Sequence, residues 1–179
     1  MLLTAPRVCT TWWKACKDPA LWRVIDFSDP NQRKSTLKYI AMCRHAVDRS
    51  QGQLLDLTIQ YFGDDALINY VVDRMAAKLG HLEELHLTLR PCIGTADIEA
   101  IGHSCPKLKS FSCNGLKYKF PTLLNGDYLP VYLYAFAISK SMPNLEHLQL
   151  FAHWIGNEGV ELILGGCPRL ESLDNKEMF

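Results

Sequence analysis

The sequence predicts an α/β protein built as a solenoid, in which short parallel strands and helices alternate along an arc. Three observations predict this class. The apolar pattern Leu-x-x-Leu-x-Leu, with other apolar residues allowed, occurs five times in 179 residues. The segments between these runs carry apolar residues at the three-and-four spacing of amphipathic helices. Turn residues precede the helical segments and prolines follow them, so turn, helix, proline and strand recur in one order.

The spacing of the five copies indicates the kind of repeat. Their first residues are 28, 26, 37 and 25 positions apart. Three of these spacings lie within the roughly 20–29 residues of leucine-rich repeats, whose units must stack to bury a continuous core. The copies are Leu54/Leu57/Ile59, Leu82/Leu85/Leu87, Leu108/Phe111/Cys113, Leu145/Leu148/Leu150 and an incomplete Leu170/Leu173/Asn175.

Helices are expected over residues 64–79, 95–105 and 157–167, and a further amphipathic helix over 34–47 precedes the first repeat strand. Apolar side chains of strand and helix should stabilise each repeat by about 1.5–3 kcal/mol for each fully buried Leu or Ile. In the last complete repeat we expect this contribution from Leu148, Leu150, Ile163 and Leu164.

The concave face of such a solenoid is the candidate binding surface. Side chains alternate along a strand, so the residues between the inward leucines should face outward. Most are polar and few share a charge sign, which suits a protein or small ligand better than phosphate. Simple solvation of an exposed sheet is the alternative at any one position. The expected contact residues are Glu84, His86, Ser110, Ser112, His147, Gln149 and Phe151.

The spacing of 37 residues departs from the repeat. The excess lies within residues 116–133, which are rich in aromatic side chains. Insertions in solenoids usually emerge as loops, often on the binding face, and aromatic residues make good interface anchors. The alternative is that Tyr134, Phe136 and Ile138 belong to a repeat helix that begins near Leu129.

Composition and motifs exclude several functions. Lys+Arg and Asp+Glu both number 19, so neither nucleic acid nor an anionic membrane is an expected partner. No long apolar stretch marks a signal peptide or membrane span, which favours the nucleus, the cytoplasm or both. Seven cysteines without a secretory signal are expected as free thiols.

No catalytic or metal-binding motif is present. The sequence lacks C-x-x-C, H-E-x-x-H and glycine-rich phosphate loops, so no metal and no cofactor is expected. His86 and His147 could approach Cys113 on neighbouring strands, but the repeat assigns this thiol to the buried side, where it is inert. We therefore expect a protein that is not an enzyme.

The N-terminal segment carries a second pattern, V-C-x-x-W from Val8 to Trp12, followed by D-P-x-L-W-x-x-I from Asp18 to Ile25. This run resembles the second half of an F-box. Residues 43–54 look like the connector of plant F-box/leucine-rich-repeat proteins, and the C-P-x-L repeat junctions are similar to theirs. The resemblance implies a partial F-box over 1–30, a connecting helix over 31–52 and leucine-rich repeats over 53–179.

The resemblance also implies a function, the substrate-recognition subunit of an SCF-type cullin-RING ubiquitin ligase. The concave face would hold a protein substrate. The N-terminal residues would dock a Skp-type adaptor and, through it, a cullin. An alternative is that the tryptophans only seal the end of the solenoid. The implied adaptor contacts are Val8, Trp12, Pro19, Leu21 and Trp22.

One departure from the family pattern defines an alternative function. An F-box normally opens with a Leu-Pro motif and a helix well upstream of V-C-x-x-W, and only seven residues precede Val8. We therefore expect the first half of the F-box to be absent. The alternative is an adaptor-independent leucine-rich-repeat interaction module, a truncated relative that binds partners without delivering them to a ligase.

Overall fold

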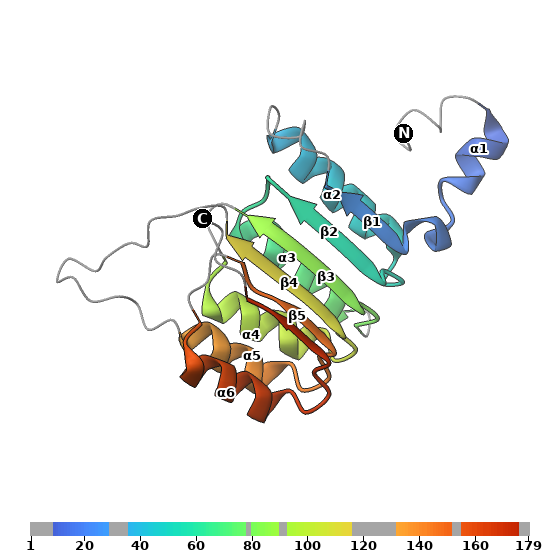
Figure 1. Ribbon diagram of the computed structural model, residues 1–179. Helices are drawn as coiled ribbons and strands as arrows, with labels where there is room; N and C mark the ends of the chain where they lie inside the picture. Colours follow the sequence, from blue (N-terminus) through green and yellow to red (C-terminus); the bar gives the residue numbers. More distant parts are fainter. Residues whose placement is uncertain are drawn as a thin grey trace.

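A single parallel sheet organises the chain. The computed structural model describes residues 9–28, 36–77, 80–89, 93–115, 132–151 and 155–175. Its six strands are hydrogen-bonded in sequence order, so the α/β class is confirmed (Figure 1). The strands are β1 (Val24–Phe27), β2 (Asp56–Gln60), β3 (Glu84–Leu89), β4 (Ser110–Gly115), β5 (His147–Gln149) and β6 (Ser172–Asp174).

A helix connects each strand to the next. Parallel strands in sequence order require crossovers of one hand, which place all the connecting helices on the same face of the sheet (Figure 1). Each of these helices packs against the one that follows it. They are α2 (Thr36–Ser50), α3 (Asp65–Ala77), α4 (Thr95–Ser104), α5 (Tyr132–Ser141) and α6 (Asn157–Gly166); α1 (Thr10–Ala15) and the 3-10 helix η2 (Pro19–Trp22) precede β1.

The helices predicted over 64–79, 95–105, 157–167 and 34–47 are confirmed as α3, α4, α6 and α2. The longest repeat spacing contains α5, so Tyr134, Phe136 and Ile138 do belong to a repeat helix. Residues 116–131, which make up most of the predicted aromatic insertion over 116–133, lie outside the described residues.

Strand β1 was not predicted. It pairs in parallel with β2, from Val24 opposite Asp56 to Phe27 opposite Ile59. Ile25 points into the core with 6% of its surface exposed, and Val24 is 61% exposed. Exposed and buried side chains alternate along this short strand, but the strand does not match the pattern Leu-x-x-Leu-x-Leu. The sheet therefore begins one strand before the first repeat copy.

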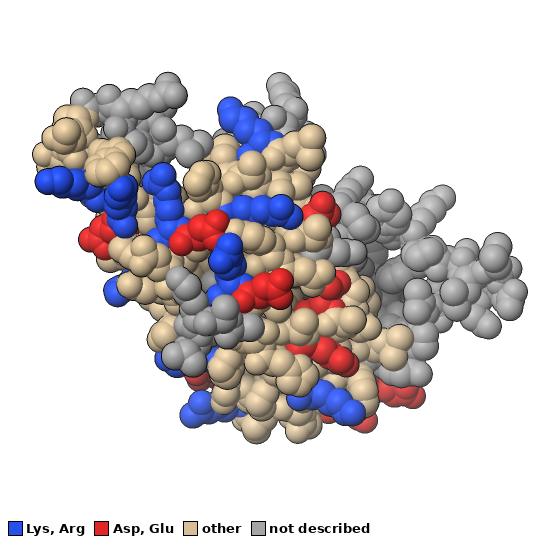
Figure 2. All heavy atoms as spheres, turned by 180° about the vertical axis from the view of Figure 1, so that it is seen from behind, with Lys and Arg blue, Asp and Glu red and all other residues tan. Residues whose placement is uncertain are grey.

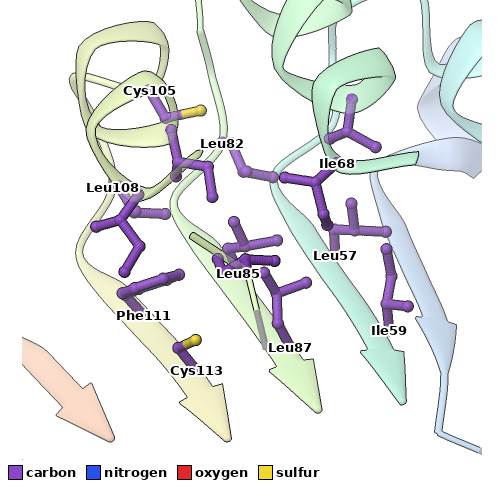
Figure 3. Packing of buried hydrophobic residues seen from close by; sticks show 14 of the residues in the cluster. Leu57, Ile59, Ile68, Leu82, Leu85, Leu87, Cys105, Leu108, Phe111 and Cys113 are labelled. Atoms are coloured by element: carbon purple, nitrogen blue, oxygen red, sulfur yellow. The ribbon is translucent and has the colours of Figure 1, made fainter. Parts of the chain in front are cut away.

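The core lies between the sheet and its helices. In Figure 3, side chains of β2, β3 and β4 point toward those of α3, α4 and the turns that enter the strands. Strand pairing aligns them in two inner rows across the sheet. The first row is Ile25, Leu57, Leu85, Phe111 and Leu148, the second is Ile59, Leu87 and Cys113, and all of them are buried. The predicted inward positions of the first four repeat copies are thereby confirmed, whereas in the incomplete fifth copy Leu170 and Leu173 are half-buried and Asn175 is exposed.

The repeat junctions show how each helix stops. The backbone N–H of Cys105 donates to the carbonyl oxygen of Ile101 at 2.9 Å, which closes the last turn of α4. Pro106 follows and has no N–H with which to continue the helix. The Asn144 side chain, one repeat later, donates to the Pro106 carbonyl oxygen at 3.0 Å. The same backbone bond recurs at Cys167, to Ile163 at 2.8 Å.

One predicted core residue is exposed. Leu148, Leu150 and Ile163 are buried as expected, but Leu164 is 56% exposed. It lies on α6, the last helix of the described chain, and no described helix packs against the side of α6 that faces away from α5. The expectation that Leu164 stabilises this repeat is therefore wrong.

The surface carries both signs of charge. Seen from the side opposite Figure 1, Lys and Arg are interspersed with Asp and Glu (Figure 2). Arg74 on α3 pairs with Asp48 on α2 at 3.0 Å. No helix within the described ranges is both long and apolar enough to cross a membrane.

Candidate functional site

The face of the sheet away from the helices is the surface that the repeat pattern predicts for binding. Strand pairing arranges its side chains in three rows, and we call these residues the open face. The first row is Val24, Asp56, Glu84, Ser110, His147 and Ser172; the second is Asp26, Thr58, His86, Ser112, Gln149 and Asp174; the third is Gln60, Thr88 and Asn114.

The structure brings most of the predicted contact residues together on β3, β4 and β5. Glu84, Ser110 and His147 are direct neighbours in the first row, and His86, Ser112 and Gln149 are neighbours in the second. Phe151 follows β5 and is half-buried. Their contact with a partner stays a prediction.

A hydrogen-bond network occupies the open face between β4 and β5. The Ser112 hydroxyl donates to Gln149 Oε1 at 2.8 Å, and the Asn114 amide donates to the same oxygen at 3.0 Å. Asn114 Oδ1 accepts from the Phe151 backbone N–H at 3.0 Å. Ser112 is only 4% exposed, although its side chain faces away from the helices. The network holds these side chains in place and fixes the chain as it leaves β5.

Two histidines flank this network. His147 Nδ1 lies 2.9 Å from the Ser172 hydroxyl on β6. His86 Nε2 lies 3.4 Å from Glu84 Oε2, two residues away on the same strand, and this imidazole is about one-third exposed. The separation is long for a hydrogen bond, so His86 is held less firmly than His147.

Carboxylates gather on the other half of the open face. Ligand atoms of Asp56, Glu84 and His86 all lie within 4.8 Å of one another. Asp56 Oδ1 is buried and accepts no hydrogen bond. Burial raises the pKa of the Asp56 carboxyl, the negative charges of Glu84 and Asp26 raise it further, and His86 opposes them.

Sequence reasoning missed this acidic group. Carboxylate and imidazole are ligands for divalent metal ions, but the common metal-binding motifs place their ligands close together in the chain. Asp56 and Glu84 are 28 residues apart. The available signal was their shared place in the repeat, each one residue before a buried strand leucine, which makes them cross-strand neighbours.

The Cys113 thiol lies away from the histidines of the open face. Cys113 is buried in the inner row, on the opposite face of the sheet from His86 and His147. Burial raises the pKa of Cys43 and Cys105 to about 12 and that of Cys167 to about 11. Thiols with such pKa values are almost wholly protonated near neutral pH and are poor nucleophiles.

Trp22 joins the N-terminal segment to α2 through contacts with Cys16 and Arg49. Its indole N–H donates to the Cys16 carbonyl oxygen at 3.0 Å. The Arg49 guanidinium lies 5.2 Å from the Trp22 ring centre and donates to the same carbonyl at 3.3 Å. Only 7% of Trp22 is exposed, so this predicted adaptor contact has a structural role as well.

The other predicted adaptor contacts differ in exposure. Leu21 is 50% exposed beside Trp22, and Pro19 is half-buried at the start of η2. Val8 and the side chain of Trp12 lie outside the described part of the chain. Trp13, which is not among the predicted contacts, is 47% exposed on α1 with the Lys17 ammonium 3.5 Å from its ring centre.

Comparison with known proteins gives a consistent set of relatives, although no protein-family model matches the chain. The chain is 37% identical to the putative F-box/LRR-repeat protein 21 of Arabidopsis thaliana over all of its own length and 67% of the relative. It is 33% identical to the putative F-box/LRR-repeat protein 9 over 97% of the chain and 77% of the relative. It is 34% identical to F-box protein SKIP19 over the whole chain and 63% of that relative. The last two are also from Arabidopsis thaliana.

Proposed function

Because the chain belongs to the plant F-box/leucine-rich-repeat protein family, we propose that it is a substrate-recognition subunit of an SCF-type cullin-RING ubiquitin ligase. The observation that carries the proposal is the extent of the similarity, which covers the N-terminal segment and the repeats together. The chain spans about two thirds of the length of these relatives, so the activity and partners of the whole protein are part of the proposal.

In this proposal the two parts of the chain have separate tasks. The repeats form an arc-shaped solenoid whose concave side is the open face, and a protein substrate binds there. The segment from α1 to η2 docks a Skp-type adaptor, which links the chain to a cullin. The contacts of Trp22 and Arg49 that join η2 to α2 support this arrangement, because a ligase must hold its substrate in a fixed position.

Leu21 is the adaptor contact that the geometry supports best. Its side chain is half exposed while its neighbour Trp22 is buried, so Leu21 can enter a pocket on a partner without unfolding the segment. Leu37 on α2 is 83% exposed and is not among the proposed contacts. It therefore serves as a matched control for the same substitution.

The test is capture of a purified plant Skp-type adaptor by the full chain. We expect the wild-type chain and Leu37→Asp to retain the adaptor, and Leu21→Asp to lose at least about tenfold in affinity, as for an interface hot spot. Circular dichroism should show that both variants fold. A wild-type chain that fails to retain the adaptor, or equal binding by the two variants, would contradict adaptor docking through η2.

A further inference from the structure

Charge is divided unevenly along this neutral chain. Residues 1–50 contain nine Lys and Arg against four Asp and Glu, whereas residues 51–179 contain ten against fifteen. The first 50 residues, which include the segment that we propose for adaptor docking, are therefore basic, and the repeats that carry most of the open face are acidic. Two surfaces of opposite charge favour partners of opposite charge.

The excess of negative charge is also found on the open face. Among its described strand positions are four carboxylates and no Lys or Arg. Two cations next to the described strands have other partners: Arg23 donates to Gln53 Oε1 at 3.2 Å, and Lys109 pairs with Glu83 at 2.9 Å. The four carboxylates are Asp26, Asp56, Glu84 and Asp174.

Three of these carboxylates meet at β1, β2 and β3. Asp56 is the direct cross-strand neighbour of Glu84, and Asp26 lies one strand away in the next row. Like charges placed opposite one another destabilise a sheet. The buried Oδ1 of Asp56 accepts no hydrogen bond, which leaves a hydrogen-bond acceptor without a donor. A cationic group from outside the chain would relieve the repulsion among these carboxylates.

We propose that the protein segment bound on the open face is basic, with a Lys or Arg side chain seated against Asp26, Asp56 and Glu84. This inference rests on the proposed function, because it names the chemistry of the substrate that the open face receives. A guanidinium offers five N–H donors in a planar fork and can bond to two carboxylates at once. The neutral network of Ser112, Asn114 and Gln149 next to it offers no competing charge.

The test uses short fluorescein-labelled peptides of alternating Gly and Arg or alternating Gly and Gln, titrated with the full chain at low salt. We expect the Arg peptide to bind and the Gln peptide not to bind. The double variant Asp56→Asn/Glu84→Gln should lose about tenfold in affinity for the Arg peptide. The matched control Glu158→Gln/Glu161→Gln removes the same charge from exposed positions on α6 and should bind as the wild type does. Thermal unfolding shows whether each variant folds.

Three results would overturn the inference. The first is an equal loss of affinity for the Arg peptide in both double variants, which would report net charge alone, and the second is equal binding of the two peptides. The third is stoichiometric Zn²⁺ binding that needs Asp56, Glu84 and His86 and displaces the Arg peptide. Adaptor capture is read separately. If the adaptor is captured and both double variants bind the Arg peptide alike, only this inference fails. If the adaptor is not captured and peptide binding still needs Asp56 and Glu84, the proposed function fails and the basic-ligand surface stands.

Discussion

Helices α4 and α6 share a local sequence pattern but have different surroundings. Each follows a glycine N-cap, Gly94 or Gly156, and each ends at a cysteine whose N–H closes the last turn. In both, an isoleucine four residues before that cysteine is buried against the core. The local pattern thus decides where each helix begins and ends and which side faces the sheet.

The helices differ at the position three residues before the cysteine. In α4 this residue is Gly102, and a Cβ atom there would lie 2.6 Å from the Ser141 carbonyl oxygen of α5. In α6 it is Leu164, which is 56% exposed. A leucine could not occupy the α4 position without moving α5. The same helical position is therefore a close contact in one repeat and free surface in the other, and the neighbouring helix makes the difference.

The largest expected effect compares a core position with this surface position. Ile101→Ala removes a side chain that is 1% exposed in α4 and should lower the free energy of unfolding by about 2–5 kcal/mol. Leu164→Ala should change it by less than about 0.5 kcal/mol. Urea unfolding followed by circular dichroism measures both. A cost for Leu164→Ala as large as that for Ile101→Ala would mean that α6 has a neighbour on its outer side.

Replacing either of two glycines by alanine should have a smaller effect on stability, and the two effects should have opposite signs. Gly102→Ala places a methyl group against the Ser141 backbone and should destabilise the protein by about 1–3 kcal/mol through overpacking. Gly165→Ala, on α6, meets no atom within 4 Å and should stabilise it by about 0.5–1 kcal/mol through helix propensity. Thermal unfolding of both variants tests this, and destabilisation by Gly165→Ala would show that α6 is not free on that side.

These contrasts show what the sequence could predict. The inward orientation of Leu57, Leu85 and Leu148 could be predicted because it depends only on the alternation of side chains within each strand. The exposure of Leu164 could not be predicted, because an apolar residue at helical spacing gives no sign of whether another helix covers it. Strand β1 was missed because four residues with two inward side chains are too short a periodic signal.

The candidate site likewise has features that could be predicted from the sequence and features that could not. The outward positions of Glu84, His86 and Gln149 followed from alternation, and the structure places them on the open face. The proximity of Asp56 to Glu84 depends on cross-strand pairing, and the burial of Ser112 depends on contacts with Gln149 and Asn114. Such properties arise from neighbours that are distant in the chain, so they require the three-dimensional arrangement.

The smallest expected effect concerns the residues just before the strands. Lys109 donates its backbone N–H to the Glu83 carbonyl oxygen at 2.8 Å, and its ammonium pairs with the Glu83 carboxylate at 2.9 Å. Glu171 makes the same backbone bond to Glu146 at 2.8 Å, but there both side chains are acidic. The residues before β5 and β6 therefore carry two like charges where those before β3 and β4 form an ion pair.

Glu171→Lys should give β5 and β6 an ion pair like the one between Lys109 and Glu83. We expect the thermal midpoint to rise by about 1–2 °C at low salt, because an exposed ion pair contributes little. Glu171→Gln removes the repulsion without adding a cation and should give about half of that rise. High salt should abolish the difference between the two variants, since exposed charges are screened. A rise that persists in high salt would show that packing by the lysine stem, and not charge, stabilises the strand.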